Sequence, residues 1–276
     1  MPMIVILKLL FSLPLLIIHL LGCFLGMMMY FFDAKFRERV SKNIKEAKIV
    51  SGKIETKNLI VKNSMHIGMA LMETFTIWFA SSTKIKKLVK KTINWDLIEQ
   101  QKSKGRGIIF LTPHMGSFEI TAQYYGIDHP IKVMFKPSKR EWINNLMFYG
   151  RNKNHVSPVN IEMSGMKQIL KSLKNGEAVG ILPDQVPPEG HGAWSKFFNQ
   201  RVYSMTLIEK LHKLTQAPII FALGRRKKIG MGFEIELFSY EDEVTVQSID
   251  QFIEKIVRTA PEQYLWNYRR YKLPKS

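Results

Sequence analysis

The sequence contains a single cysteine, Cys23, in 276 residues. One cysteine cannot form an intramolecular disulfide or a cysteine-based zinc site, and it is compatible with a reducing compartment. The chain also lacks a Gly-x-Ser-x-Gly elbow and a His-Glu-x-x-His motif. We therefore expect no serine or cysteine nucleophile in a recognisable elbow and no bound metal.

Acidic residues are scarce as well: 23 Asp and Glu stand against 41 Lys and Arg, for a formal net charge of +18. Such a surface attracts phospholipid headgroups, nucleic acid or an acidic protein, and charge alone does not choose among them. The sequence has no RNP, zinc-finger or basic-zipper pattern, and its aromatic residues are not interleaved with its basic run as a base-stacking surface requires. We therefore expect no nucleic-acid partner.

The longest apolar run extends from Met3 to Phe32 and exceeds the roughly 20 residues that cross a bilayer. A secretory signal has a shorter apolar region and a small-residue cleavage site, so we predict an uncleaved membrane anchor over residues 1–32 that crosses once. By the positive-inside rule, the basic residues that follow it place the remaining chain in the cytoplasm. These residues are Lys35, Arg37, Arg39, Lys42, Lys45 and Lys48.

Residues 33–103 are predicted to form basic juxtamembrane and membrane-associated helices. The segment from Ala34 to about Lys57 is suited to lie on an anionic leaflet, although a merely solvated helix has the same pattern. The segment Met65 to Ala80 has a broad apolar face, which fits a helix packed on the core or partly in the membrane.

Residues 104–276 alternate between strand and helix patterns, which predicts a catalytic α/β domain with a mostly parallel sheet flanked by helices. Strands are expected at 107–111, 131–135, 156–159, 178–182, 218–223 and 233–238. Helices are expected at 140–149, 166–173, 206–214, 249–257 and 261–268.

The most informative stretch is the end of the strand Gly107 to Leu111, where Pro113 stops the strand and His114 follows. Ser117 is a candidate N-cap for a helix that carries Glu119 in its first turn. Ligands of open α/β sheets bind at this kind of strand–helix junction. We interpret His114 as a general base and Glu119 as the carboxylate that orients it, although the same spacing also arises by chance. Without a protein nucleophile, a substrate hydroxyl would attack directly.

Four blocks in order carry a resemblance to a known family: His114-Met115-Gly116-Ser117-Phe118-Glu119, the run from Gly176 to Asp184-Gln185, Phe197-Phe198, and Pro261-Glu262-Gln263-Tyr264-Leu265-Trp266 with Arg269-Arg270. Together they resemble the bacterial lipid A biosynthesis acyltransferases of the lauroyl and myristoyl transferase type, within the lysophospholipid acyltransferase superfamily. Two positions depart from the usual pattern. Ser117-Phe118 replaces Asn-Trp, and Lys136-Pro137 replaces Arg-Pro.

The resemblance implies late secondary acylation, in which a fatty acyl group moves from acyl carrier protein to a hydroxyl of a phosphorylated glycolipid precursor of lipid A. It implies an anionic inner membrane as the location and no cofactor beyond the carrier-protein thioester. His114 and Glu119 are then the expected catalytic pair. The expected substrate-binding residues are Gly116 and Ser117 (backbone amides for an oxyanion), Lys136, Arg151 (an oxyanion or a phosphate), Asp184 and Gln185.

Two alternatives stay open from the sequence. One is acyl transfer to another lipid acceptor, such as a lysophospholipid or an aminolipid. The other is a non-catalytic membrane-bound adaptor for anionic lipids, against which the intact His114 and Glu119 argue. Acyl-chain length, the acceptor hydroxyl and the oligomeric state are not determined by these patterns.

Overall fold

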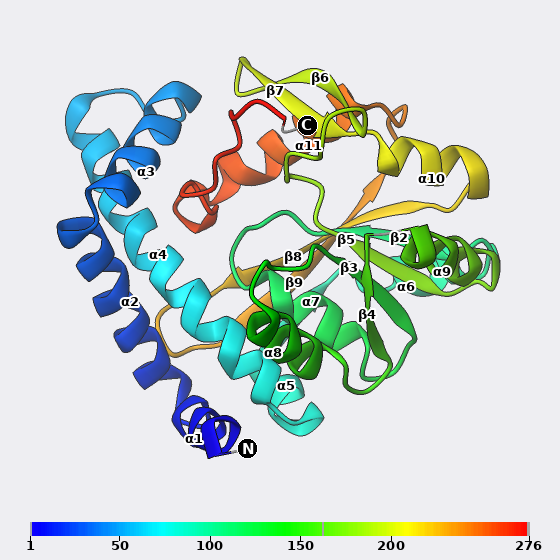
Figure 1. The fold of residues 1–276 in the computed structure, drawn as a ribbon, viewed down its shortest axis with the longest axis horizontal. Coiled ribbons are helices and arrows are strands. Elements are labelled where there is room, and N and C mark those ends of the chain that lie inside the picture. The colour runs from blue at the N-terminus through cyan, green and yellow to red at the C-terminus, as the bar shows by residue number, and fades with distance from the viewer. Residues whose placement is uncertain (1, 162, 275–276) are drawn as a thin grey trace.

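The computed structural model describes residues 2–161 and 163–274. Its centre is a seven-stranded sheet in the order β1-β9-β8-β2-β5-β3-β4, flanked by helices (Figure 1). All neighbouring strands in this sheet are parallel except β8 and β9. The predicted fold class is therefore confirmed. The strands are β1 (Val89–Ile93), β2 (Ile108–Leu111), β3 (Ile131–Phe135), β4 (Val156–Asn160), β5 (Ala178–Ile181), β8 (Ile219–Arg226) and β9 (Phe233–Tyr240).

Two apolar cores lie on the two faces of this sheet, because successive side chains of a strand point to opposite faces. In β2, Ile109 and Leu111 belong to one core, while Ile108 and Phe110 belong to the other. All four residues of β2 are buried, as expected for a central parallel strand covered on both sides. The helices around the sheet are α5 (Ser82–Leu88), α6 (Leu97–Lys102), α7 (Phe118–Tyr125), α8 (Glu141–Arg151), α9 (Met163–Lys174), α10 (Leu207–Thr215) and α11 (Val246–Thr259).

Two segments differ from the sequence prediction. The stretch between the predicted strand 178–182 and the predicted helix 206–214, for which no strand was expected, contains an antiparallel hairpin of β6 (Gly192–Phe197) and β7 (Gln200–Met205). The predicted helix 261–268 contains only a 3-10 turn, Pro261–Gln263, and then extends. Besides local turn bonds, the backbone of this segment bonds to the loop that carries His114, through the Gln263 carbonyl and the Leu265 N–H.

The N-terminal third forms four helices: α1 (Pro2–Phe11), α2 (Leu15–Phe32), α3 (Ala34–Ala47) and α4 (Lys53–Phe79). The predicted helix from Ala34 to Lys57 is confirmed as far as Ala47, but the chain then breaks at Lys48 and Gly52, with φ of 48° and 98°, before α4 begins. The predicted helix from Met65 to Ala80 corresponds to the second half of α4. Helices α2 and α4 lie side by side along one flank of the molecule (Figure 1).

Helices α2 and α4 touch backbone to backbone. A Cβ added at Gly26 would lie 2.1 Å from the carbonyl oxygen of Ser64, and one added at Gly68 would lie 2.1 Å from that of Gly22. Only glycine permits so close an approach. One face of α2 is therefore packed on the protein, while the other exposes large apolar side chains: Leu16, Ile17, Leu20, Leu21, Phe24, Met28, Phe31 and Phe32.

Within the described residues, α2 is the one helix that is long and apolar enough to cross a membrane. Its exposed apolar face is consistent with a membrane association, because a monomeric soluble protein rarely exposes so large an apolar patch.

Candidate active site

The segment from Thr112 to Ser117, here called the catalytic loop, connects β2 to α7 and carries His114. Strand β5 is the parallel neighbour of β2, with Leu111 opposite Ile181. The chain leaving β5 reaches Asp184 and Gln185 at the same edge of the sheet. Strand order therefore brings His114, Asp184 and Gln185 together, as predicted for one cleft.

His114 is paired with Asp184. Its Nδ1 lies 2.7 Å from Asp184 Oδ1, and its backbone N–H donates to Asp184 Oδ2 at 3.0 Å. An ionised carboxylate only accepts hydrogen bonds, so the imidazole carries its proton on Nδ1 and leaves a lone pair on Nε2. Burial would raise the pKa of the Asp184 carboxyl, but His114 and Arg270 lower it, and the net pKa is below the ordinary value.

Glu119 does not fill the role predicted for it. It lies in the first turn of α7 and faces the end of α8, where the guanidinium of Arg151 bonds both its carboxylate oxygens, with Nε at 3.1 and 3.0 Å. Both side chains are buried. The predicted contact between His114 and Glu119 is therefore replaced by two separate pairs, His114 with Asp184 and Arg151 with Glu119.

The other nitrogen of the imidazole, Nε2, lies 3.2 Å from Nε2 of Gln185. The Gln185 amide is a donor there, so the His114 lone pair accepts from it. The rings of Phe118 and Tyr268 flank the imidazole, with centroids at 5.0 and 6.5 Å. The His114 side chain is 17% exposed. A hydroxyl that replaced the Gln185 amide would meet the Nε2 lone pair, which is the contact that a general base requires.

The backbone amides predicted to hold an oxyanion are already in use. The Gly116 N–H donates to the Gln263 carbonyl at 2.9 Å, and the Ser117 N–H donates to the Gly224 carbonyl at 2.7 Å. A φ of 59° at Gly116, and a Cβ position only 2.2 Å from the Gly224 oxygen, explain why glycine stands there. The oxyanion role predicted for these two amides is therefore wrong in this conformation.

The two predicted cationic groups have different surroundings. Lys136 follows β3 and is exposed at the same edge of the sheet as His114. Arg151 is committed to Glu119, and its guanidinium also lies 5.6 Å from the ring centre of Trp78. A substrate-binding role for Lys136 stays a prediction. The contacts of Arg151 with Glu119 and Trp78 were not predicted from the sequence.

Sequence reasoning also missed the residues that support the catalytic loop from the C-terminal segment. The N–H of Leu265 donates to the His114 carbonyl at 2.9 Å, and Met115 forms a β-bridge with Tyr264. The hydroxyl of Tyr268 accepts from the Val186 N–H at 2.9 Å. The block from Pro261 to Trp266 was visible as a motif, but its partners lie far away in the chain.

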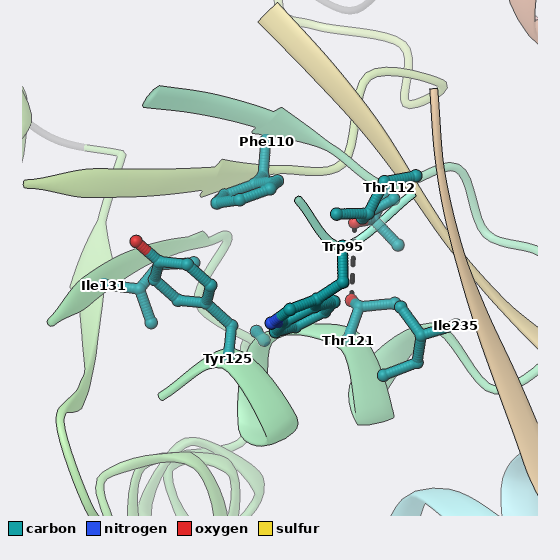
Figure 2. Close-up of a pocket in the computed structure, with 11 residues that line it drawn as sticks. Trp95, Phe110, Thr112, Thr121, Tyr125, Ile131 and Ile235 are labelled. Carbon is teal, nitrogen blue, oxygen red and sulfur yellow. Dashed lines mark hydrogen bonds between the residues drawn. The ribbon is translucent and has the colours of Figure 1, made fainter. Parts of the chain in front are cut away.

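A small cavity lies between α7 and the sheet (Figure 2). Its volume is about 20 Å³, enough for roughly one water molecule. At that size it does not accommodate an acyl chain. The lining includes Trp95, Phe110, Thr112, Thr121 and Tyr125. In the described parts of the chain, no group of three His, Cys, Asp or Glu side chains is placed to hold a metal ion.

Comparison with known proteins identifies relatives of this chain. Residues 3–273 match the family described as bacterial lipid A biosynthesis acyltransferase. The chain is 27% identical over 275 residues to the lipid A biosynthesis lauroyltransferase of Escherichia coli K12, covering 97% of this chain and 89% of that protein. It is 26% identical over 268 residues to the lipid A biosynthesis palmitoleoyltransferase of the same organism, covering 95% and 87%. The match to the lipid A biosynthesis myristoyltransferase of that organism is weaker, with 19% identity over 197 residues, 68% of this chain and 61% of that protein.

Proposed function

This chain belongs to the bacterial lipid A biosynthesis acyltransferase family, and from that membership we propose that it moves a fatty acyl group from acyl carrier protein to a hydroxyl of a lipid A precursor, as a late secondary acylation. Family membership makes it an enzyme of acyl transfer with an acyl donor and a glycolipid acceptor. The carrier-protein donor and the late step are the proposal.

The observation that carries the chemistry is the pair of His114 and Asp184, with Nε2 of His114 turned to Gln185. The acceptor hydroxyl takes the place of the Gln185 amide and gives its proton to Nε2 as its oxygen attacks the thioester carbonyl. The imidazolium that forms is stabilised by the Asp184 carboxylate. His114 is then the catalytic residue, and Asp184 is a positioning residue that holds one tautomer.

The second half of the reaction uses the same proton. The tetrahedral intermediate collapses, the carbon–sulfur bond breaks, and the proton on His114 passes to the leaving thiolate. The products are an ester of the acceptor and free carrier-protein thiol, so no cofactor is consumed. Because the amides of Gly116 and Ser117 are occupied, the negative oxygen needs a donor from elsewhere. Lys136, exposed at the same edge, is one candidate for that charge or for an acceptor phosphate.

The proposed location is the cytoplasmic side of the inner membrane. The outer face of α2 is apolar, and the basic residues that follow it favour an anionic cytoplasmic leaflet. A single crossing by α2 would require it to leave α4, which would expose Gly22, Gly26 and the buried His19. We therefore propose that α2 stays on the domain and lies in the interface, in place of the single pass that its length predicts.

The test is a transfer assay with the purified full-length chain in detergent micelles. The lipid A precursor with acyl carrier protein as donor should give the acylated product, identified by mass spectrometry. A matched reaction offers a lysophospholipid or an aminolipid as acceptor. Faster transfer to one of these would reassign the acceptor, and no transfer to any acceptor would support the non-catalytic adaptor.

A further inference from the structure

A network of buried polar side chains lies between the N-terminal helices and the catalytic loop. It joins His19 on α2, Glu73 and His66 on α4, and Arg226 at the end of β8. His19, Glu73 and Arg226 are at most 4% exposed. None of these residues contacts His114 directly, so the proposed reaction does not account for them.

Arg226 is the centre of this network. Its Nε and Nη2 bond the two carboxylate oxygens of Glu73, with Nη2 at 2.7 Å, and its Nη1 lies 2.7 Å from Nδ1 of His66. Nη2 also donates to the carbonyl oxygen of Gly116 at 3.2 Å. Arg226 therefore reaches from the α4 helix to the catalytic loop.

The opposite end of the network is on the apolar helix α2. The Gly230 N–H donates to Nδ1 of His19 at 3.0 Å, so the proton of the ring is on Nε2. That nitrogen lies 2.7 Å from Oε1 of Glu73. Burial would raise the pKa of Glu73, but Arg226 and His19 lower it to about 2. Burial and the neighbouring Arg226 lower the pKa of His66 to about 3. The negative charge of the Glu73 carboxylate thus balances the positive charge of the Arg226 guanidinium.

Hydrogen bonds hold the catalytic loop at both the N–H and the carbonyl of Gly116. Arg226 bonds the carbonyl, and the carbonyl of Gln263 accepts from the Gly116 N–H. The side chain of Gln263 in turn bonds the backbone N–H and carbonyl of Arg226 at 2.9 and 3.1 Å. Gly116 follows His114 by two residues, so a displacement here moves the base.

We propose that Arg226 is a positioning residue for the catalytic loop, and that Glu73 and His19 couple its position to the seating of α2 on α4. The helix with the exposed apolar face is in this way part of the support of the active site. The inference rests on the proposed transfer reaction only for its kinetic consequence, since the contacts themselves do not depend on the substrate.

The main test replaces the charged pair by apolar side chains of similar size, in the double variant Arg226→Met with Glu73→Leu. Such a replacement of a buried ion pair is often neutral for stability, but it removes the donor to Gly116. Small displacements of a reacting group cost up to about 10²-fold in rate. We expect kcat to fall roughly tenfold or more, with little change in KM and in melting temperature.

The second variant is Arg226→Lys, which can pair with Glu73 but cannot also supply the fork that reaches Gly116. If the double variant does not fold, the kcat of Arg226→Lys tests the proposal by itself. The matched control is Arg225→Met with Glu236→Leu, which removes a neighbouring partly buried pair, 2.7 Å apart, between β8 and β9. The control should keep the wild-type kcat.

Hydrogen–deuterium exchange of the peptide 112–118 provides a readout without substrate. We expect exchange to rise in both Arg226 variants and not in the control. Wild-type protection of this peptide, or wild-type kcat in folded Arg226 variants, would overturn the proposal. If the wild-type chain transferred no acyl group, the proposed function would be wrong. The exchange measurement would still test the contact between Arg226 and Gly116.

Discussion

The imidazole of His114 lies 2.7 Å from the carboxylate of Asp184, although the two residues are 70 positions apart. The nearer carboxylate in sequence, Glu119, is held by Arg151. Two parallel strands, β2 and β5, end side by side and place His114 and Asp184 at one edge of the sheet. The carboxylate that contacts His114 is therefore supplied by the sheet topology and not by the local motif.

The first prediction concerns this pair. His114→Ala should lower kcat by roughly 10²-fold or more, because the positioned base is lost. Asp184→Asn should lower it by a similar factor, since the amide places a donor against Nδ1 and moves the proton to Nε2. Purified variants at saturating substrates provide the measurement, with Asp184→Glu as the conservative rescue.

A changed pH–rate profile in Asp184→Asn separates positioning from simple loss of structure. If both Asp184 variants turned over at the wild-type rate, the assignment of Asp184 would be wrong.

The second prediction concerns Glu119. Glu119→Ala leaves the buried guanidinium of Arg151 without its partner, which should lower the free energy of unfolding by about 3–5 kcal/mol. Chemical denaturation in detergent measures it. The control is Glu236→Ala, which breaks a partly exposed pair with Arg225 and should cost less than about 1 kcal/mol. Equal costs for the two variants would contradict the structural role of Glu119.

The third prediction is a pH dependence of stability. The pKa of Glu73 is lowered in the fold from 4.5 to about 2, so the stabilising charged form is present above pH 4.5 and is lost as the pH falls toward 2. The melting temperature of the wild type should therefore exceed that of Glu73→Gln near neutral pH, and the difference should shrink across this interval. A difference that stays constant down to pH 2 would show that the carboxylate charge is not the cause.

The fourth prediction concerns the acyl donor. Acyl carrier proteins are strongly acidic, so a chain with a net charge of +18 should capture them by an attraction that is screened over about 8 Å at physiological ionic strength. With acceptor saturating, kcat/KM for the carrier-protein donor should fall steeply with salt. Coenzyme A thioesters should be poorer donors with a shallower slope. Equal efficiencies and equal slopes would assign the basic surface to the membrane alone.

The fifth prediction concerns the seating of α2. In a Cys23→Ala background, a cysteine at the exposed position Ser12 reports which side of the membrane the start of α2 occupies. If α2 lies in the interface on the domain, an impermeant maleimide should label Ser12→Cys only after cells are lysed. Labelling in intact spheroplasts would show that α2 crosses the membrane.

Features that depend on short-range patterns could be predicted from the amino-acid sequence. Alternating apolar runs predicted the α/β fold, Pro113 marked the end of β2, and His114 was correctly placed at a strand end. The length and composition of α2 also predicted an apolar helix. These features follow from periodicity and from the chemistry of single residues, which do not require knowledge of the partners.

The contacts between distant groups could not be predicted in this way and follow from the folded arrangement of the elements. Asp184 reaches His114 because β5 lies beside β2 in the sheet. Gln263 reaches Gly116 because the chain extends directly after the Pro261–Gln263 turn and does not continue as the predicted helix. His19 is a polar residue in an apolar helix by sequence, yet it is fully buried against Glu73. Such pairings depend on strand order and helix packing, which result from burying the whole core at once and leave no local trace in the chain.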